Sequence, residues 1–445
     1  MKEKLFWNRE VETRAVEEQQ ALDTKALKQQ LGYVYQHASL YRNLFNKAGV
    51  TPEHFTCLGD LKQFPFTTKE DLRKTQAEEG GLGGHQCAPM ENIIRIQGTS
   101  GTTGRPLFIG LTRNDVHLWN ELFTRHAWTG GLRPDDIIVN PANFTLFVGG
   151  LSECSGAESM GMTVIPAPFV STGTEKFMDI VGNFKPTVLF STPSATVFLE
   201  DAIRKFLKVE PNQLGFKKGF LAGEALSDEE RERIEKTWGI VARNFYGLAD
   251  VAADIAAECG HSEGLHFCGQ DALVPELIDP ETLDVIPMET GAEGEIVFTT
   301  IRREATPVFR YRVRDMVRVY TDPCPCGRTS FRFHIIGRSD DMIKVKGVNV
   351  FPSAVKGVVQ SFVPETTGEF RIVLPHKGPT FGENLTIKVE LREGLVSEEC
   401  ERLKEKMIRE IREKLVFTPR IEWIPAESLE RSQYKVVYFE RTYQE

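Results

Sequence analysis

The stretch that decides the fold is IIRIQGTSGTTGRP, residues 93–106. It opens with a strand-like apolar run and continues as a loop in which glycines are interspersed with four hydroxyl residues before an arginine. Glycines allow backbone N–H groups to turn toward a phosphate, while hydroxyls and a cation supply further donors. The Gly-Lys-Ser/Thr ending of a Walker loop is absent at the required spacing. A flexible turn is the alternative, but this composition directly after a strand favours a phosphate-binding loop.

Around this loop, short apolar runs alternate with helical stretches between about residues 93 and 297. This alternation predicts an α/β body with largely parallel strands. The expected strands are residues 137–139, 163–165, 187–190 and 219–221, and the expected helices are residues 115–128 and 228–238.

The two ends of the chain have a different character. A polar pattern predicts one long helix from Arg9 to Val34, and Thr67 with Glu70 forms a capping box at a further helix start. After Gly337 the pattern becomes a small α+β domain, so we expect domains at residues 1–337 and 338–445. Its expected helices are residues 352–362 and 397–415, and its expected strands are residues 370–374, 385–391 and 420–424.

Composition excludes several classes of protein. The chain has 445 residues, which predicts two or three domains, and 41% of them are hydrophobic, enough for a buried core. With 54 Lys and Arg against 63 Asp and Glu, the net charge of −9 argues against a nucleic-acid partner. No run of about 18 apolar residues is present, so we expect no membrane span. Residues 1–31 lack the apolar core of a signal peptide, which predicts a cytoplasmic protein.

Four segments, in one order along the chain, resemble the adenylate-forming (AMP-dependent) ligases. The loop at 99–106 is followed by NFYGLAD at 244–250, YRVRD at 311–315 and GRSDD at 337–341. Residues 64–72 and 347–352 are similar, more narrowly, to the phenylacetate–coenzyme A ligase branch. The resemblance implies a large N-terminal domain with mixed or parallel sheets, which binds ATP and the acid, and a small mobile C-terminal domain.

The resemblance also implies a nucleotide site. The glycine-rich loop would donate to the ATP phosphates, Tyr246 would stack on adenine, and Asp315 would accept hydrogen bonds from the ribose. Arg338 would reach the nucleotide, and Gly347 would approach the thiol tunnel. For Asp315 and Arg338 an ordinary surface ion pair is the alternative. The full set of expected cofactor-binding residues is Thr99, Ser100, Gly101, Thr102, Thr103, Gly104, Arg105, Gly223, Glu224, Ala225, Asn244, Tyr246, Gly247, Asp315, Arg338 and Gly347.

Two catalytic residues follow from the same resemblance. Lys435 would bridge the carboxylate and the α-phosphate during adenylation, although a lysine near a terminus is usually a solvated surface residue. Asp340 would be the hinge of the small domain. Asp250 would hold Mg²⁺, but the family's Thr/Ser-Glu pair is Ala249-Asp250 in this chain. We interpret this shorter carboxylate as weakening or retuning adenylation, because Mg²⁺ demands near-ideal geometry.

The acyl pocket is expected beside the nucleotide. Residues 140–150 resemble the aromatic-substrate segment of the branch. Plain core packing is the alternative for each aromatic residue in such a segment. The expected wall consists of Phe144, Phe147, Ala222 and Phe245.

The eight cysteines are too few and too scattered for a disulfide framework. Two tight groups nevertheless predict a structural zinc site of the Cys₃His type. Its expected ligands are Cys259, His266, Cys324 and Cys326, with His261 and Cys268 as substitutes. A set of free thiols is the alternative.

Together these features predict an enzyme that uses ATP and Mg²⁺ to convert a phenylacetate-like aryl acid into an acyl-adenylate and then a coenzyme A thioester. Lys344, Lys346 and Lys356, near Gly347, favour free coenzyme A modestly. One alternative is transfer to a carrier-protein thiol or an amine. Another is a degenerate homologue that binds nucleotide or aryl ligand without turnover. Because members of the branch are often dimers, the resemblance adds a homodimer.

Overall fold

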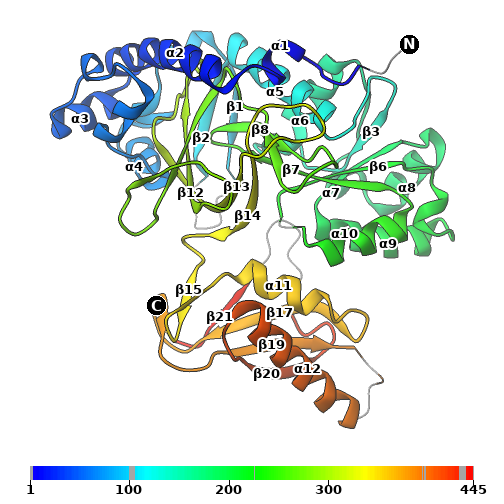
Figure 1. The fold of residues 1–445 in the computed structure, drawn as a ribbon. Coiled ribbons are helices and arrows are strands. Elements are labelled where there is room, and N and C mark those ends of the chain that lie inside the picture. The colour runs from blue at the N-terminus through cyan, green and yellow to red at the C-terminus, as the bar shows by residue number, and fades with distance from the viewer. Residues whose placement is uncertain are drawn as a thin grey trace. The chain divides into compact units, whose positions relative to one another are not determined.

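A computed structural model of the chain describes residues 4–99, 106–224, 226–392, 394, 397–429 and 437–443 (Figure 1). The chain divides into two compact units. The larger contains Met1–Gly223 and Thr237–His334, and the smaller contains Glu224–Lys236 and Ile335–Glu445. The domain boundary after residue 337 stays a prediction. No helix in the described part of the chain is both long enough and apolar enough to cross a membrane.

The α/β alternation predicted between about residues 93 and 297 is present from residue 137 to residue 248. Five neighbouring strands run parallel, and each pair that follows in sequence is joined by helices, as parallel strands require. The strands are β3 (Ile137–Asn140), β4 (Thr163–Pro166), β5 (Val188–Ser191), β6 (Lys218–Ala222) and β7 (Val241–Leu248). The connecting helices are α6 (Val148–Met160), α7 (Phe169–Thr172), α8 (Thr174–Phe184), α9 (Pro193–Phe206), with η5 (Pro211–Gln213), and α10 (Asp228–Trp238).

Beyond Leu248 the same sheet continues antiparallel, so the sheet is mixed, which agrees with the expected mixed or parallel sheets. Within the described residues this sheet has 12 strands in the order β11-β10-β12-β13-β14-β9-β8-β7-β6-β5-β3-β4. Its later strands are β8 (Ala252–Ala257), β9 (Leu265–Phe267), β10 (Leu273–Ile278), β11 (Val285–Ile286), β12 (Glu293–Thr300), β13 (Tyr311–Tyr320) and β14 (Arg332–Arg338). Short turns replace helices here, so neighbouring strands reverse direction.

The glycine-rich loop belongs to a separate hairpin, in which β1 (Ile93–Gly98) pairs antiparallel with β2 (Phe108–Thr112). Behind the parallel strands, α5 (Arg113–Thr129) packs Phe123 and Trp128 against Phe220 and Phe245 of the sheet. Helix α6 approaches α5 closely at Gly156, where an added Cβ would lie 2.3 Å from the Phe123 ring. This core therefore fixes the strand ends that carry the expected site.

The N-terminal helices depart from the sequence prediction. The expected single helix is divided into two helices, α1 (Arg9–Glu12) and α2 (Val16–His37). Long-range ion pairs hold the chain in a non-helical conformation between them. Glu12 pairs with Arg328 at 2.7 Å, and Arg14 pairs with Asp271 at 2.5 Å. The remaining helices before the hairpin are α3 (Ser39–Ala48), α4 (Lys69–Glu79) and the short η1 (Pro52–His54), η2 (Leu58–Gln63), η3 (Gly83–His85) and η4 (Met90–Asn92).

The capping box predicted from Thr67 and Glu70 is wrong by one residue. Helix α4 is capped by Thr68, whose side chain accepts from the backbone N–H of Asp71, while the Asp71 carboxylate accepts from the backbone N–H of Thr68. The Thr67 hydroxyl instead donates to the Phe309 carbonyl at 2.5 Å. A tertiary hydrogen bond therefore decides which of the two threonines caps the helix.

The smaller unit has the predicted α+β character. A four-stranded sheet in the order β20-β19-β17-β21 is covered by helices, and a second sheet holds a hairpin. Besides most of α10 and the end of β14, its described helices are α11 (Pro352–Gln360) and α12 (Ser397–Leu415), and its described strands are β15 (Ile343–Val345), β16 (Val348–Val350), β17 (Thr366–Leu374), β18 (Thr380–Phe381), β19 (Thr386–Leu391), β20 (Arg420–Pro425) and β21 (Phe439–Arg441).

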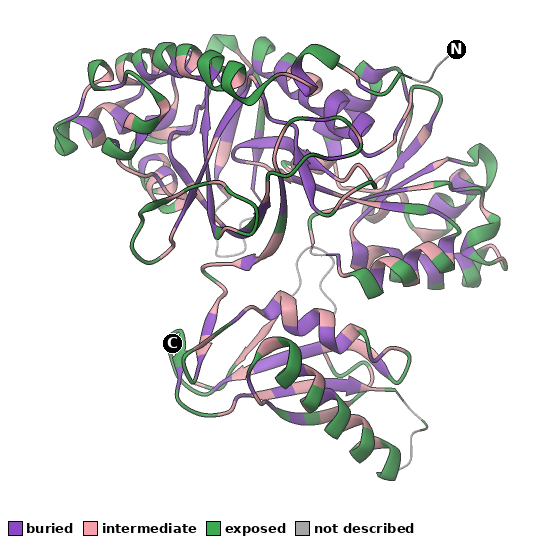
Figure 2. Cartoon of the chain, in the orientation of Figure 1, coloured by how far each residue is buried: buried purple, intermediate pink, exposed green. Residues whose placement is uncertain are grey.

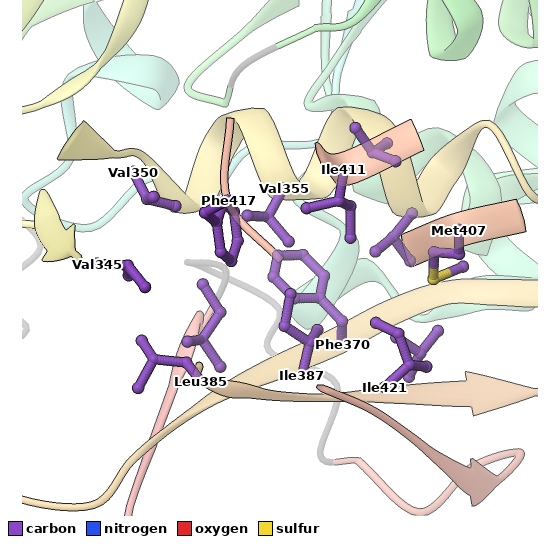
Figure 3. Close-up of a cluster of buried hydrophobic side chains, with 14 of the residues drawn as sticks. Val345, Val350, Val355, Phe370, Leu385, Ile387, Met407, Ile411, Phe417 and Ile421 are labelled. Carbon is purple, nitrogen blue, oxygen red and sulfur yellow. The ribbon is translucent and has the colours of Figure 1, made fainter. Parts of the chain in front are cut away.

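The core of this unit lies between the sheet and its helices (Figure 3). Met407 and Ile411, one turn apart on α12, face Phe370 and Ile387 of the sheet. The rest of α12 is largely exposed (Figure 2). Most of the contribution of α12 to stability therefore comes from a narrow apolar face.

We expect Ile411→Ala to destabilise the smaller unit by about 2–5 kcal/mol, because the side chain is fully buried and its removal leaves a cavity. Arg409→Ala, at an exposed position on the same helix, should change stability by less than about 0.5 kcal/mol. Hydrogen exchange of peptides from residues 352–425 in the full chain measures both effects. Equal exchange rates in the two variants would contradict this description of the core.

Candidate active site

The base of the glycine-rich loop is closed by its first threonine. The Thr99 N–H donates to the Leu107 carbonyl at 3.0 Å, and the Leu107 N–H donates to Thr99 Oγ1 at 3.3 Å. Thr99 is buried, so its hydroxyl serves the loop's own structure. The other expected loop residues, Ser100–Arg105, lie outside the described residues.

The loop base is tied to the segment expected to bind the acid. The Gly98 N–H donates to the Leu146 carbonyl at 2.7 Å, and Gln97 Nε2 donates to the Phe147 carbonyl at 3.5 Å. Ser152 of α6 donates to Gln97 Oε1 at 2.8 Å. Hydrogen bonds at these three points hold Leu146, Phe147 and Ser152 beside the base of the glycine-rich loop, and the role of residues 140–150 in binding the acid stays a prediction.

The four expected wall residues differ in their surroundings. Phe144, Phe147 and Ala222 are half-buried. Phe245 is 2% exposed and stacks on Phe220 with ring centroids 3.8 Å apart. The interpretation of Phe245 as a wall residue is therefore not supported, since its ring belongs to the core. Phe144, Phe147 and Ala222 stay predicted wall residues.

Two tyrosine–aspartate pairs join β7 and its following turn to β13. The Tyr246 hydroxyl, on β7, donates to Asp315 Oδ2 on β13 at 2.6 Å. In the opposite sense, the Tyr311 hydroxyl at the start of β13 donates to Asp250 Oδ2 after β7 at 2.7 Å. All four side chains are buried. The structure thus brings together three expected site residues, Tyr246, Asp250 and Asp315, and adds Tyr311.

The protonation of Tyr311 follows from its surroundings. Burial, and then the nearby charge of Asp250, raise the pKa of the Tyr311 phenol well above its ordinary value. The phenol therefore stays protonated and donates to the carboxylate. A carboxylate holding such a bond keeps other lone pairs for a ligand.

A lysine completes this group. Lys69 Nζ, in the first turn of α4, lies 3.4 Å from the same Asp250 Oδ2. The strand-like stretch before α4 pairs with β13 because Thr67 donates its N–H to the Arg310 carbonyl and accepts from the Arg312 N–H. Residues 64–72 were singled out in the sequence as typical of one family branch, but the contribution of Lys69 to the site was missed. The only signal for it was its place in that motif.

Gly247 is required by a close approach of two backbones. A Cβ at Gly247 would lie 1.5 Å from the Ala253 carbonyl oxygen, where the β7–β8 register shifts.

The remaining predicted residues of the larger unit lie at the ends of its strands. Asn244, on β7, donates its backbone N–H to Glu258 at 2.8 Å. Gly223, just after β6, has φ of +82°, and Glu224 follows it. Ala225 lies outside the described residues.

The expected residues of the smaller unit lie around its first strands. Arg338, at the end of β14, forms a two-point ion pair with Asp340, both bonds at 2.9 Å. Both side chains are partly exposed, so the ordinary ion pair weighed as an alternative for Arg338 is present in this structure. Lys346 and Gly347, with φ of +51° and +86°, form the two-residue turn between β15 and β16. Lys435 lies outside the described residues.

The expected cysteine and histidine ligands come together. One ligand atom from each of Cys259, His266, Cys324 and Cys326 lies within 4.8 Å of the others. Cys326 Sγ is 3.3 Å from His266 Nε2, and Cys259 Sγ is 3.6 Å from Cys324 Sγ. Of the substitutes, Cys268 is buried beside Thr129. The other substitute, His261, contacts Cys259 through its backbone N–H.

Comparison with known proteins decides the family. Residues 23–301 match the AMP-binding enzyme family, and residues 347–440 match the AMP-binding enzyme C-terminal domain. The chain belongs to the AMP-binding enzyme family. The glycine-rich loop and residues 244–250 lie within the first matched segment, residues 347–352 begin the second, and residues 311–315 and 337–341 lie between the two.

Individual AMP-binding enzymes are similar over nearly the whole chain. The phenylacetate–coenzyme A ligase of Thermus thermophilus is 33% identical over 96% of this chain and 97% of its own length. The phenylacetate–coenzyme A ligase of Escherichia coli is 36% identical over 86% of this chain and 85% of its own length. Among solved structures, a 2-hydroxyisobutyryl-CoA ligase in the postadenylation state has 26% identity and a TM-score of 0.89, covering 99% of this chain and 93% of that one.

We expect Gly247→Ala in this AMP-binding enzyme to lower stability by about 1–3 kcal/mol or more and to weaken ATP binding, since the turn that carries Asp250 must move. Gly182→Ala, inside α8 with open space around it, is the matched control and should stabilise the fold by up to about 1 kcal/mol. Thermal unfolding and calorimetric ATP titration measure both. Unchanged behaviour of Gly247→Ala would show that the backbones are not in close contact.

Proposed function

We propose that the chain is an AMP-forming ligase that joins an aryl carboxylic acid to coenzyme A. The observation that carries this proposal is 33–36% identity to curated phenylacetate–coenzyme A ligases over 86–96% of the chain. The two matched family segments, in order, support the same function. In the first half-reaction the acid carboxylate attacks the α-phosphorus of ATP, and pyrophosphate leaves. In the second, the thiol of coenzyme A attacks the acyl-adenylate, and AMP leaves.

In this proposal the nucleotide lies in the larger unit. The glycine-rich loop donates to the phosphates, the Tyr246 ring stacks on adenine, and Asp315 accepts from the ribose hydroxyls. Asp315 already accepts a hydrogen bond from Tyr246, but an ionised carboxylate offers about four lone-pair sites. The Tyr246 hydroxyl therefore orients Asp315 and leaves it able to bind the ribose.

The smaller unit supplies the remaining groups of the proposal. Lys435 places a positive charge beside the reacting carboxylate and α-phosphate, where charge develops during adenylation. Arg338 exchanges its pairing with Asp340 for the nucleotide, and Asp340 is the hinge. Gly347, in its two-residue turn, approaches the thiol channel. One enzyme can then use a domain movement to serve two half-reactions in turn.

Magnesium would neutralise the ATP phosphates, with Asp250 as its expected protein ligand. Asp250 is a buried carboxylate and hence a suitable oxygen donor. One of its oxygens, Oδ2, is already engaged by Tyr311 and by the ammonium of Lys69. The residues therefore fit a metal ion only if the Lys69 ammonium moves away from Asp250 Oδ2.

The acid is an aryl acid in this proposal. The curated relatives are named for phenylacetate, and the half-buried Phe144 and Phe147 lie in the segment tied to the phosphate loop. The similar solved structure is named for the aliphatic 2-hydroxyisobutyryl group, so an aliphatic acid is the competing class. The homodimer and the cytoplasmic location stay predictions.

We expect pyrophosphate release that requires ATP, Mg²⁺ and an aryl acid, and thioester that forms only when coenzyme A is added. Lys435→Ala should slow adenylation by about 10²–10³-fold, because it removes charge stabilisation at the transition state. It should leave thioester formation from a prepared acyl-adenylate largely intact. Lys377→Ala, an exposed lysine in the same unit, is the control. Pyrophosphate assay and mass detection of the thioester measure these steps across aryl and aliphatic acids.

Each alternative gives a different result in that experiment. Pyrophosphate without thioester would indicate a carrier-protein thiol or an amine as acceptor. Of the three lysines thought to favour coenzyme A, Lys356 is 6% exposed and is not available to its phosphates, whereas Lys346 is exposed. ATP binding without pyrophosphate release for any acid would indicate the degenerate homologue, and Asp250→Glu would then test the shortened carboxylate.

We further propose that Cys259, His266, Cys324 and Cys326 hold a structural zinc. With Zn–S bonds of about 2.3 Å, ligand atoms at the corners of a tetrahedron are roughly 3.5–3.8 Å apart. The 3.6 Å and 3.3 Å separations in the cluster are close to this geometry. The second ring nitrogen of His266 lies 3.4 Å from Ser330 Oγ, a contact of the kind that orients a ligating imidazole. Four protein ligands leave no open position, so the metal would be structural.

We expect about one zinc per purified chain, lost in Cys326→Ser and retained in Cys268→Ser, because the Cys268 thiol lies outside the cluster. Removal of the metal should lower the thermal midpoint of the wild-type protein, since metal binding contributes to folding. Elemental analysis and thermal unfolding measure both. A metal-free wild type with the same stability as Cys326→Ser would instead establish free thiols.

A further inference from the structure

The Asp250 carboxylate has two partners at one oxygen. Oδ2 accepts from the Tyr311 hydroxyl at 2.7 Å and lies 3.4 Å from the Lys69 ammonium. The Asp250 side chain is 8% exposed, whereas that of Lys69 is 33% exposed. The aspartate is thus fixed in the protein interior, while the lysine reaches it from an accessible position.

The position of Lys69 at the start of α4 is electrostatically unfavourable for the helix. Lys69 is the first residue of α4, and a positive charge at a helix N-terminus opposes the helix dipole. Exposed lysines with no specific role are better placed elsewhere on a helix. Its pairing with a buried carboxylate offsets the unfavourable position, which indicates that the chain uses a cation at this point.

The segment that carries Lys69 is held rigidly. Arg310 donates to the Phe64 carbonyl at 2.6 Å, and its guanidinium lies 3.8 Å from the centre of the Phe66 ring. The other edge of that guanidinium, Nε and Nη2, donates to the Glu276 carboxylate at 3.0 and 2.8 Å. These contacts hold the backbone before α4 against β13, so a change of partner by Lys69 needs only its side chain to move.

We propose that Lys69 is a phosphate-binding cation that alternates between two partners, Asp250 in the free protein and the ATP phosphates in the nucleotide complex. The proposal rests on the proposed function, since it requires ATP at this site. An ammonium and a divalent cation repel each other, so they do not share Asp250 Oδ2. When magnesium–ATP enters, the negative phosphates attract the ammonium, and the carboxylate becomes available to the metal. The flexible four-carbon stem of lysine permits this exchange.

The exchange also explains how a buried carboxylate is tolerated before the nucleotide binds. A charge taken out of water without a counterion is strongly destabilising. Lys69 supplies that counterion until magnesium replaces it. A purely structural ion pair would instead stay closed when ATP binds, and this is the competing interpretation.

The test compares Lys69→Met, which keeps the length of the side chain but removes the charge, with Lys74→Met. Lys74 lies on the same helix, its side chain is 73% exposed, and it forms an ion pair with the exposed Glu78. Calorimetric titration of the full chain with magnesium–ATP should show at least tenfold weaker binding for Lys69→Met and none of this loss for Lys74→Met. Adenosine, which has no phosphates, should bind both variants like the wild type.

A second measurement follows Mn²⁺ by paramagnetic resonance without nucleotide. Lys69→Met should bind Mn²⁺ several-fold more tightly than the wild type, because Asp250 has lost its cation. Adding Asp250→Asn should abolish the gain. Unchanged affinity for both magnesium–ATP and Mn²⁺ in Lys69→Met would overturn the proposal.

A double-mutant cycle separates the two interpretations even if Lys69→Met folds poorly. In the Asp250→Asn background no buried charge needs a counterion, so the fold tolerates loss of Lys69. If Lys69 binds the phosphates, Lys69→Met still lowers the affinity of the Asp250→Asn protein for ATP at least tenfold. If Lys69 is purely structural, Lys69→Met leaves the ATP affinity of the Asp250→Asn protein unchanged, and this result would overturn the proposal. Failure of the ligase function is distinguishable, because the wild type would then bind no ATP or form no thioester from any acid.

Discussion

Two crossed hydrogen bonds are the constraint on which the candidate site depends. Tyr246 binds Asp315, and Tyr311 binds Asp250, so each of two chain segments supplies one phenol and one carboxylate. β7 and β13 are separated by three strands in the sheet order, and no backbone ladder joins them. These buried side-chain bonds therefore fix the distance between the segments. A carboxylate left without its phenol would retain its desolvation cost, which makes the pairs costly to break singly.

The two crossed hydrogen bonds place requirements on neighbouring residues. The turn that carries Asp250 follows Gly247, where β7 passes so close to Ala253 that no Cβ fits. On the other side, β13 begins at Tyr311, directly after residues bound to Thr67 and Phe64. The segment before α4 is thereby part of the same assembly. The lysine that follows it reaches Asp250 for this reason and not because of its own helix.

The sequence predicts the parts of this site that depend on local pattern. Apolar runs alternating with helices predict the parallel strands, whereas most of the predicted phosphate-binding loop lies outside the described residues. Cysteine and histidine spacing predicts the four-residue cluster, because its ligands come from two short segments of the chain. Long-range contacts are not predictable in this way. The break between α1 and α2 depends on Arg328 and Asp271, the cap of α4 depends on Phe309, and Phe245 is buried by Phe220. In each case a partner distant in sequence overrides the local preference.

The sequence has Ala249-Asp250 where the resemblance implies a Thr/Ser-Glu pair, and the same geometry gives this difference a physical interpretation. The carboxylate of an aspartate stays close to its backbone, and here it lies between a phenol and an ammonium that both approach Oδ2. Loss of one methylene relative to glutamate is thus accompanied by two partners that hold the charge near β13. Alanine at the preceding position adds no competing hydroxyl. Asp250 is paired with Lys69 in this structure. Under the proposed function, the effect of the shorter carboxylate on metal binding is therefore coupled to Lys69, and the charge available to the ATP phosphates depends on both residues together.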